Sequence, residues 1–132
     1  MLPSVTSDPL WNLEAYRSAL FLTSVARDDA QLVPPGGAPV AAAAQLLRAA
    51  GSVSANIGEG YSRRTRTDRL RFLEYALGSA RECISWYEAL GGTLGAAALD
   101  SRRLLVARIR ALLLGLIRSL RERNTPRTPL ES

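Results

Sequence analysis

The 132-residue sequence contains no histidine and no lysine, and its only cysteine is Cys83. Without histidine, acid–base catalysis by an imidazole is excluded, and too few ligands remain for a zinc site of cysteines and histidines. One cysteine cannot form a disulfide within the chain, so Cys83 is expected to be a small core residue. The sequence also lacks a glycine-rich phosphate-binding loop. We therefore expect no enzyme activity, no catalytic residue, no metal and no cofactor.

All 17 basic residues are arginines, against 12 acidic residues, so the net charge is +5 and the isoelectric point lies near 10.3. A basic excess favours anionic partners, with RNA or DNA ahead of an acidic protein or a membrane surface. Arginines interrupt the richest apolar segments, so no stretch reaches the length of a membrane span. The first residues lack the basic and apolar regions of a secretory signal. A cytoplasmic protein without a membrane partner is expected.

Prolines and glycines divide the chain into four long segments. Within each segment apolar residues recur at steps of three and four, as they do on one face of a helix. No run alternates with the period of a β-strand. The sequence predicts an all-α fold, an antiparallel up-and-down four-helix bundle within residues 9–123. The predicted helices are 9–31, 39–61, 66–90 and 94–123, between a flexible N-terminal segment, 1–8, and a flexible C-terminal tail, 124–132.

Local signals predict the helix ends and the sides that face the core. Asp8, followed by Pro9, is the predicted N-cap of the first helix, and Thr65 with Asp68 forms a predicted capping pair for the third. The glycine pair 91–92 is expected to end the third helix. The stripe that the second helix is predicted to turn to the core consists of Val40, Ala43, Ala44, Leu47, Ala50, Ser54, Ile57 and Tyr61.

The most specific pattern lies in the middle of the chain. Residues 52–65 read SVSANIGEGYSRRT, followed by LRFL at 70–73 and ALGSARE at 76–82. With these motifs in this order, the sequence resembles the bacterial four-helix-bundle proteins typified by the 23S ribosomal RNA intervening-sequence protein. The accessory variability determinant of diversity-generating retroelements is a more distant relative.

The resemblance implies a helical bundle that assembles as a homopentamer and is often encoded within or near RNA-derived insertions. Because the retroelement relative binds a reverse transcriptase and nucleic acid, the resemblance also implies RNA, DNA or a reverse transcriptase as a partner. Ser54 stands where the family usually has proline, and Gly58 where it usually has alanine. Replacing proline restores a backbone donor and removes a ring clash, so we expect the fold to survive with a milder kink.

Asn56, Glu59 and Gly60 are singled out within this pattern. If Asn56 is buried it must be hydrogen-bonded, because an unpaired buried polar group costs about 1–3 kcal/mol. We interpret the three residues as a structural motif, in which Asn56 ties the second helix to a neighbouring helix. Glu59 is expected to pair with Arg63 one turn on, or with an arginine across the bundle. A polar binding site is the alternative interpretation.

Five arginines fall within nine residues at the predicted turn between the second and third helices, with one acid among them. Guanidinium groups beside the free amides of a helix N-terminus can bind phosphate, and a neighbouring tyrosine can stack on a base. A solvated turn with salt bridges is the alternative. The predicted nucleic-acid-binding residues are Tyr61, Arg63, Arg64, Arg66, Arg69 and Arg71.

Apolar residues beyond one face of the last helix predict a subunit contact. Leu114 and Ile117 lie on or near the arginine side of this helix, so we interpret them as an oligomer interface. The predicted function is that of a non-catalytic, nucleic-acid-associated accessory factor, in which a homo-oligomer presents repeated arginine clusters to phosphates. The alternative function is a structural scaffold or adaptor that binds a protein partner and has no nucleic-acid role.

Overall fold

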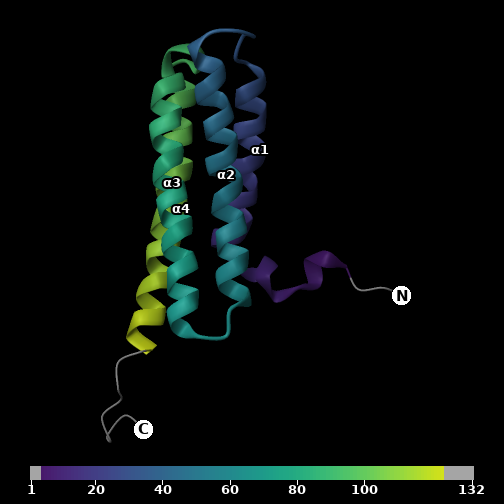
Figure 1. The fold of residues 1–132 in the computed structure, drawn as a ribbon, viewed down its shortest axis with the longest axis vertical. Helices are drawn as coiled ribbons and strands as arrows, with labels where there is room; N and C mark the ends of the chain where they lie inside the picture. The colour runs from purple at the N-terminus through teal and green to yellow at the C-terminus, as the bar shows by residue number, and fades with distance from the viewer. Residues whose placement is uncertain (1–3, 124–132) are drawn as a thin grey trace, which may run out of the picture.

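The computed structural model describes residues 4–123, and these form the predicted all-α four-helix bundle (Figure 1). Two short 3₁₀ helices are followed by four long α-helices that run up and down in alternation. No strand occurs in residues 4–123. The predicted tail at 124–132, and residues 1–3 of the predicted N-terminal segment, lie outside the described residues. The elements are η1 Val5–Ser7, η2 Pro9–Asn12, α1 Glu14–Gln31, α2 Ala38–Ser62, α3 Arg66–Leu94 and α4 Ala96–Arg123.

The chain enters the bundle through a break at Leu13. Asp8 is a helix cap, as predicted, since its Oδ1 accepts a hydrogen bond of 2.9 Å from the Leu10 N–H, but the helix that it caps is η2. Leu13 has extended backbone angles, so α1 begins at Glu14. The predicted start of the first helix at residue 9 is too early, because a cap signal does not say how far the helix continues.

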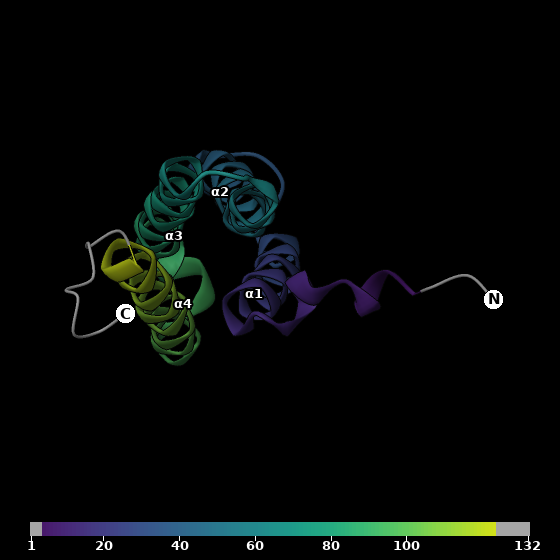
Figure 2. The same ribbon diagram turned by 90° about the horizontal axis from the view of Figure 1, so that it is seen from below.

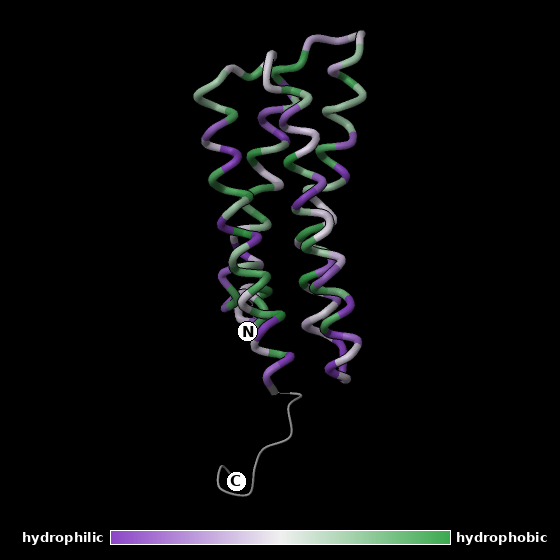
Figure 3. Tube along the Cα trace, turned by 90° about the vertical axis from the view of Figure 1, so that its left-hand side faces the viewer, coloured by the Kyte–Doolittle hydropathy of each residue, from purple (hydrophilic) through white to green (hydrophobic). Residues whose placement is uncertain are grey.

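Apolar side chains from all four helices form one core. α1 contributes Ala19 and Leu22 to it, and α3 contributes Leu77 and Tyr87. Colouring by hydropathy shows hydrophobic residues recurring between hydrophilic ones along the helices (Figure 3). Cys83 is buried in this core as predicted, and burial raises the pKa of its thiol to about 12. Other buried core residues are Leu46, Val53, Ile57, Leu73, Ala80, Leu90, Val106, Ile109 and Leu113.

The side of α2 that faces the core matches only part of the predicted stripe, of which Ala43, Ala50 and Ile57 are buried. Val40, Leu47 and Tyr61 are exposed, whereas their neighbours Leu46 and Gly60 are buried. α2 is rich in alanine, glycine and serine, so apolar or small residues lie on almost every side of it and the periodicity does not single out one face. Packing against α3 and α1 decides the face instead, and the buried side carries Leu46, Val53 and Ile57 among alanines.

The third helix is longer than predicted. It continues through the glycine pair to Leu94 and ends at Gly95, whose φ of 91° lies in the left-handed region that favours glycine. Gly91 lies inside α3, where a Cβ would come within 2.9 Å of the Leu99 Cδ2 atom. The Leu99 side chain therefore occupies the space beside Gly91, and the glycine pair that was interpreted as a helix end lies inside the helix.

A buried charge in α1 joins three helices, and it was not predicted. Asp29 lies in the core and is held by Arg102 of α4 and Tyr87 of α3. Burial raises the pKa of Asp29, but the hydrogen bonds from Arg102 and Tyr87 outweigh it, so the pKa lies below its usual range. Burial also raises the pKa of Tyr87, and the hydrogen bond to Asp29 raises it further.

Ion pairs also join neighbouring helices at the surface of the bundle. Seen along the bundle, consecutive helices lie side by side and α4 comes back beside α1 (Figure 2). Exposed pairs of this kind contribute about 0–1 kcal/mol each, so they orient the helices more than they stabilise them. None of the helices in residues 4–123 has the length and apolar character needed to cross a membrane. The ion pairs between helices are Arg48–Glu82, Arg103–Glu88, Arg121–Glu74 and Arg108–Glu14.

Candidate nucleic-acid interface

The arginine cluster lies at the turn between α2 and α3, at the lower end of the bundle in Figure 1. α2 ends when Arg63 becomes extended, with its N–H donating to the Gly60 carbonyl. Thr65 then caps α3 as predicted, because its hydroxyl accepts a 3.1 Å hydrogen bond from the Asp68 N–H. The cap residues of the two helices, Arg63 and Thr65, are separated by one residue, so the turn is tight. The arginines on either side of the turn are therefore close together.

Gly60 allows the two helices to approach at this turn. It is buried, and a Cβ placed on it would lie 3.3 Å from both the Arg69 carbonyl oxygen and the Phe72 Cβ. These distances are tighter than ordinary contacts, so the backbone of α3 packs directly against the last turn of α2. The geometry of the arginine cluster therefore depends on a glycine at position 60.

Arg63 and Arg71 both lie close to one aromatic ring. The guanidinium carbons of Arg63 and Arg71 are 4.8 Å and 5.2 Å from the centroid of the Phe72 ring. Tyr75, which is exposed, meets the same ring edge to face at 5.7 Å between centroids. This stack restricts two flexible arginines, and it places an exposed aromatic side chain beside them. No sequence signal pointed to Phe72 or Tyr75 as part of the cluster.

Each of these two arginines also has an acidic partner. Arg63 Nη2 lies 2.5 Å from Glu59 Oε2, which is one of the pairings expected for Glu59, and Arg71 Nη2 lies 3.4 Å from Asp68 Oδ1. All four side chains are about half exposed, so the pairs are screened by water and weakly held. A polyanion can therefore compete for both arginines at small cost, and two acids against five arginines leave the turn positive.

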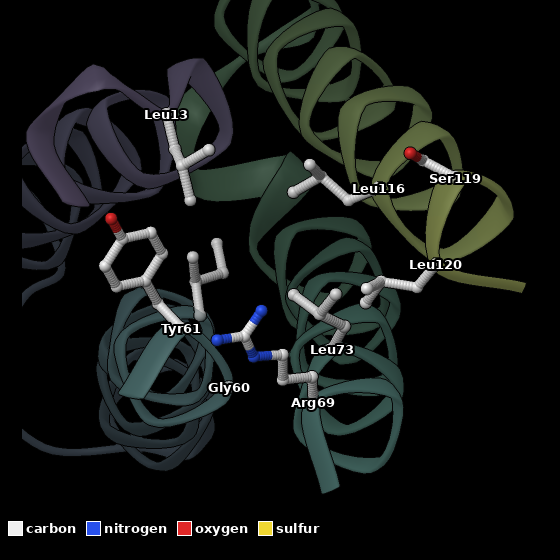
Figure 4. A pocket seen from close by; sticks show the side chains of 9 residues that line it. Leu13, Gly60, Tyr61, Arg69, Leu73, Leu116, Ser119 and Leu120 are labelled. Carbon is white, nitrogen blue, oxygen red and sulfur yellow. The ribbon is translucent and has the colours of Figure 1, made fainter. Parts of the chain in front are cut away.

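The other predicted residues do not all face outward. Arg64 is exposed at the turn, and Arg66, in the first turn of α3, is partly exposed. Arg69 instead turns inward, where its Nε donates a 2.7 Å hydrogen bond to the Arg63 carbonyl and its side chain lines a pocket at the end of the bundle (Figure 4). Tyr61 lines the same pocket with part of its ring exposed. The structure thus divides the six residues into four arginines at the outside of the turn and a pair, Arg69 and Tyr61, that lines the pocket.

Asn56 does not reach a neighbouring helix directly, which corrects the predicted tie. Its side-chain nitrogen donates to the carbonyl and the hydroxyl of Ser52, one turn earlier in α2, at 2.8 and 2.9 Å. The Ser52 hydroxyl is hydrogen-bonded to the Ser79 hydroxyl of α3 at 2.9 Å. The link between α2 and α3 is therefore a chain through Ser52, because the α2 face that meets α3 carries the serine and not the asparagine.

The two predicted interface residues of α4 have different positions. Leu114 is 37% exposed and faces outward, whereas Ile117 is only 3% exposed and belongs to the bundle core. The prediction for Ile117 is wrong, because Ile117 lies on the same side of α4 as the buried Ile109 and Leu113. Leu104, at 73% exposure, is an exposed apolar residue of α4 that the sequence analysis did not single out.

The chemistry available at the turn is that of anion binding. Among residues 4–123 there is no group of three or more histidine, cysteine or carboxylate side chains that could hold a metal ion. What the turn offers is a set of guanidinium groups with fixed donor forks, two of them stacked on Phe72, beside the capped start of α3. Such groups suit phosphates, which accept charge-assisted hydrogen bonds from arginine.

Comparison with known proteins gives one family and one fold. The model of the 23S rRNA-intervening sequence protein family matches residues 13–104. No curated protein sequence matches the chain significantly. The chain is similar to the crystal structure of a protein with unknown function from the S23 ribosomal protein family of Bacteroides thetaiotaomicron, with a TM-score of 0.71 and 23% identity over 78% of this chain and 97% of that chain. At this identity the structural similarity shows a shared fold.

Proposed function

The chain belongs to the 23S rRNA-intervening sequence protein family, and on this basis we propose that it is a non-catalytic, oligomeric accessory protein that binds nucleic acid. The observation that carries the proposal is the arginine cluster at the α2–α3 turn, in which Arg63 and Arg71 are stacked on Phe72. The nucleic acid is bound through its phosphates by Arg63, Arg64, Arg66 and Arg71. Contacts of this kind carry no base information, so binding is largely independent of sequence.

A second feature supports an oligomer. α4 has an exposed row of apolar residues spaced by three, four and three positions, on the side opposite its core residues; we call this row the outer seam. This is the spacing with which helices pack against one another in coiled coils. A row of apolar residues at this spacing suits burial against another helix, and in this proposal another copy of the chain supplies it. The outer seam consists of Leu104, Ala107, Ala111 and Leu114.

Oligomerisation and nucleic-acid binding reinforce each other in this proposal. One arginine cluster with half-exposed salt bridges binds phosphate weakly, but several clusters on one assembly bind a single strand together. The effective concentration of the second cluster is high once the first is bound, which raises the overall affinity without new contacts. A pentamer, which the family resemblance implies, gives five such clusters.

The test is a nucleic-acid titration with charge-matched variants. Fluorescence anisotropy measures the affinity of the purified protein for a labelled RNA of mixed sequence at low salt. A variant with Arg63, Arg64 and Arg66 changed to Gln is expected to bind at least about tenfold more weakly. The control changes three exposed arginines elsewhere in the bundle to Gln, and it is expected to bind nearly as well as the parent. These are Arg27, Arg81 and Arg110.

The outcomes separate the two functions considered. Equal loss in both triple variants would mean that net charge alone matters, and no loss in the first would mean that the turn is only a solvated loop. A scaffold that binds a protein partner is the second candidate, and the exposed Leu104 favours it, because an apolar surface also suits a protein. The scaffold predicts no measurable RNA binding by the parent at any salt concentration.

A further inference from the structure

The lower end of the bundle contains a pocket that the proposed function does not use. It has a volume of about 210 Å³ and is lined by residues near the ends of α2, α3 and α4 and by Leu13, which precedes α1 (Figure 4). Most of its lining is leucine and isoleucine, with three polar side chains among them. The lining residues are Leu13, Ile57, Gly60, Tyr61, Arg69, Leu73, Leu116, Ser119 and Leu120.

Arg69 brings a positive charge into this apolar pocket. Its side chain reaches from α3 toward the middle of the ring of lining residues, in the direction of Tyr61 (Figure 4). The Nε–H group of Arg69 donates a hydrogen bond to the Arg63 carbonyl oxygen. Within residues 4–123, the two Nη groups of Arg69 have no hydrogen-bonding partner. A guanidinium among leucines gains strongly from a negative partner, because water screens the attraction less there than at an open surface.

The protein does not supply that partner from the described residues. None of the nine lining residues is acidic. The acids on the nearby turns of α2 and α3 are engaged elsewhere: Glu59 pairs with Arg63, Asp68 with Arg71, and Glu74 with Arg121. Within residues 4–123, the pocket thus combines guanidinium donors that have no acceptor with an apolar wall.

We propose that this pocket binds a small apolar carboxylate, with the carboxylate on the Nη groups of Arg69 and the apolar part among Leu13, Leu116 and Leu120. A planar guanidinium donates two parallel hydrogen bonds to a carboxylate. Tyr61 and Ser119, which carry hydroxyl groups, line the same pocket. The volume sets the size of the ligand: a cavity of about 150 Å³ holds benzene, and drug-sized ligands take about 300 Å³ or more. A single ring or a short alkyl chain fits, whereas a polynucleotide does not enter.

Phenylacetate is the probe, and its amide is the matched neutral control. Amide-proton NMR spectra of the full chain, recorded during a titration, are expected to show saturable shifts at residues that line the pocket. Phenylacetamide, which has the same shape without the charge, is expected to bind about tenfold more weakly. Inorganic phosphate is expected to leave Leu13, Leu116 and Leu120 unshifted, because it has no apolar part to place among them.

Three variants make the test specific. Arg69→Gln is expected to weaken phenylacetate binding about tenfold, whereas Arg64→Gln, an exposed arginine outside the pocket, changes it less than about twofold. Ser119→Phe leaves Arg69 in place and fills the pocket, so it is expected to abolish binding, and it decides the question if Arg69→Gln does not fold. Equal binding of the acid and the amide, unchanged affinity in Arg69→Gln or Ser119→Phe, or the absence of saturable shifts would each overturn the proposal. Because RNA affinity is not measured, these results are independent of the proposed function.

Discussion

Arg102 of α4 holds the carboxylate of Asp29 in α1 through two parallel hydrogen bonds, from Nε to Oδ2 at 2.8 Å and from Nη2 to Oδ1 at 2.9 Å. The Tyr87 hydroxyl of α3 donates a third hydrogen bond to Oδ2 at 2.7 Å. Asp29 is 2% exposed, and Arg102 keeps a quarter of its side chain in contact with solvent. The triad thus links α1, α3 and α4 through one buried carboxylate.

Removing the guanidinium is expected to destabilise the fold strongly. Arg102→Met keeps the length of the side chain but leaves Asp29 charged and buried, and we expect the free energy of unfolding to fall by about 3 kcal/mol. Adding Asp29→Leu to this variant removes the stranded charge and is expected to recover most of the loss. Urea unfolding of the parent and both variants measures this. A double variant no more stable than Arg102→Met would contradict the account.

The same pair predicts how stability depends on pH. The pKa of Asp29 is lower in the fold than in the unfolded chain, so the unfolded state takes up protons first as the pH falls. The stability that Asp29 contributes is therefore complete above about pH 5 and is lost as the pH falls below about 4, the ordinary range of an aspartate. Melting temperatures of the parent and Asp29→Asn should differ by a constant amount from pH 6 to 8 and converge toward pH 3. A gap that widens in acid would contradict this sign.

Gly60 predicts a steric effect at the turn. Gly60→Ala places a Cβ 3.3 Å from a backbone oxygen of α3, which cannot easily move, and crowding of this kind costs about 1–3 kcal/mol. The gain in helix propensity offsets about 1 kcal/mol, so a net loss of about 1 kcal/mol is expected. Gly51→Ala is the control, because nothing lies within 4 Å of its Cβ and the same change is expected to stabilise α2. If both variants are stabilised, the close approach at Gly60 is not a constraint.

The outer seam predicts the assembly. Replacing Leu104 and Leu114 by Gln removes the two largest apolar side chains of the seam without touching the core. Sedimentation equilibrium should give a mass several times the 14.3 kDa of one chain for the parent and a lower mass for the variant. Val40→Gln, an exposed apolar residue of α2, is expected to leave the parent's mass unchanged. A parent that sediments as a monomer at micromolar concentration would remove the oligomer from the proposal.

The sequence predicted the parts of the fold that depend on local signals and strong periodicity. The cap at Thr65 and the number of helices follow from residue types that have few alternatives in a helix. The core face of α2 did not follow, because an alanine-rich helix has small residues on several sides and only its contact with α3 selects one. The end of α3 was placed too early, because Gly91 serves the packing of Leu99 and not a turn.

The sequence predicted where the arginine cluster lies in the fold, but not how its side chains are arranged. The arginine run located the turn, yet a run of like residues does not say which members point outward, and Arg69 turns into the pocket. Phe72 was not singled out, since its role depends on two arginines that meet only after the turn has formed. The Asp29–Arg102 pair could not be predicted either, because the two residues lie 73 positions apart in the sequence.

The most direct test of the central claim is the salt dependence of RNA binding by the unmodified protein. If arginines at the α2–α3 turn bind phosphates, the logarithm of the association constant falls linearly with the logarithm of salt concentration. Displacement of counterions from about three phosphates of a single strand gives a slope of about −2, and a multivalent assembly gives a steeper one. We expect a slope of −2 or steeper between about 50 and 200 mM salt. A slope near zero, or no binding at the lowest salt concentration, would contradict the account.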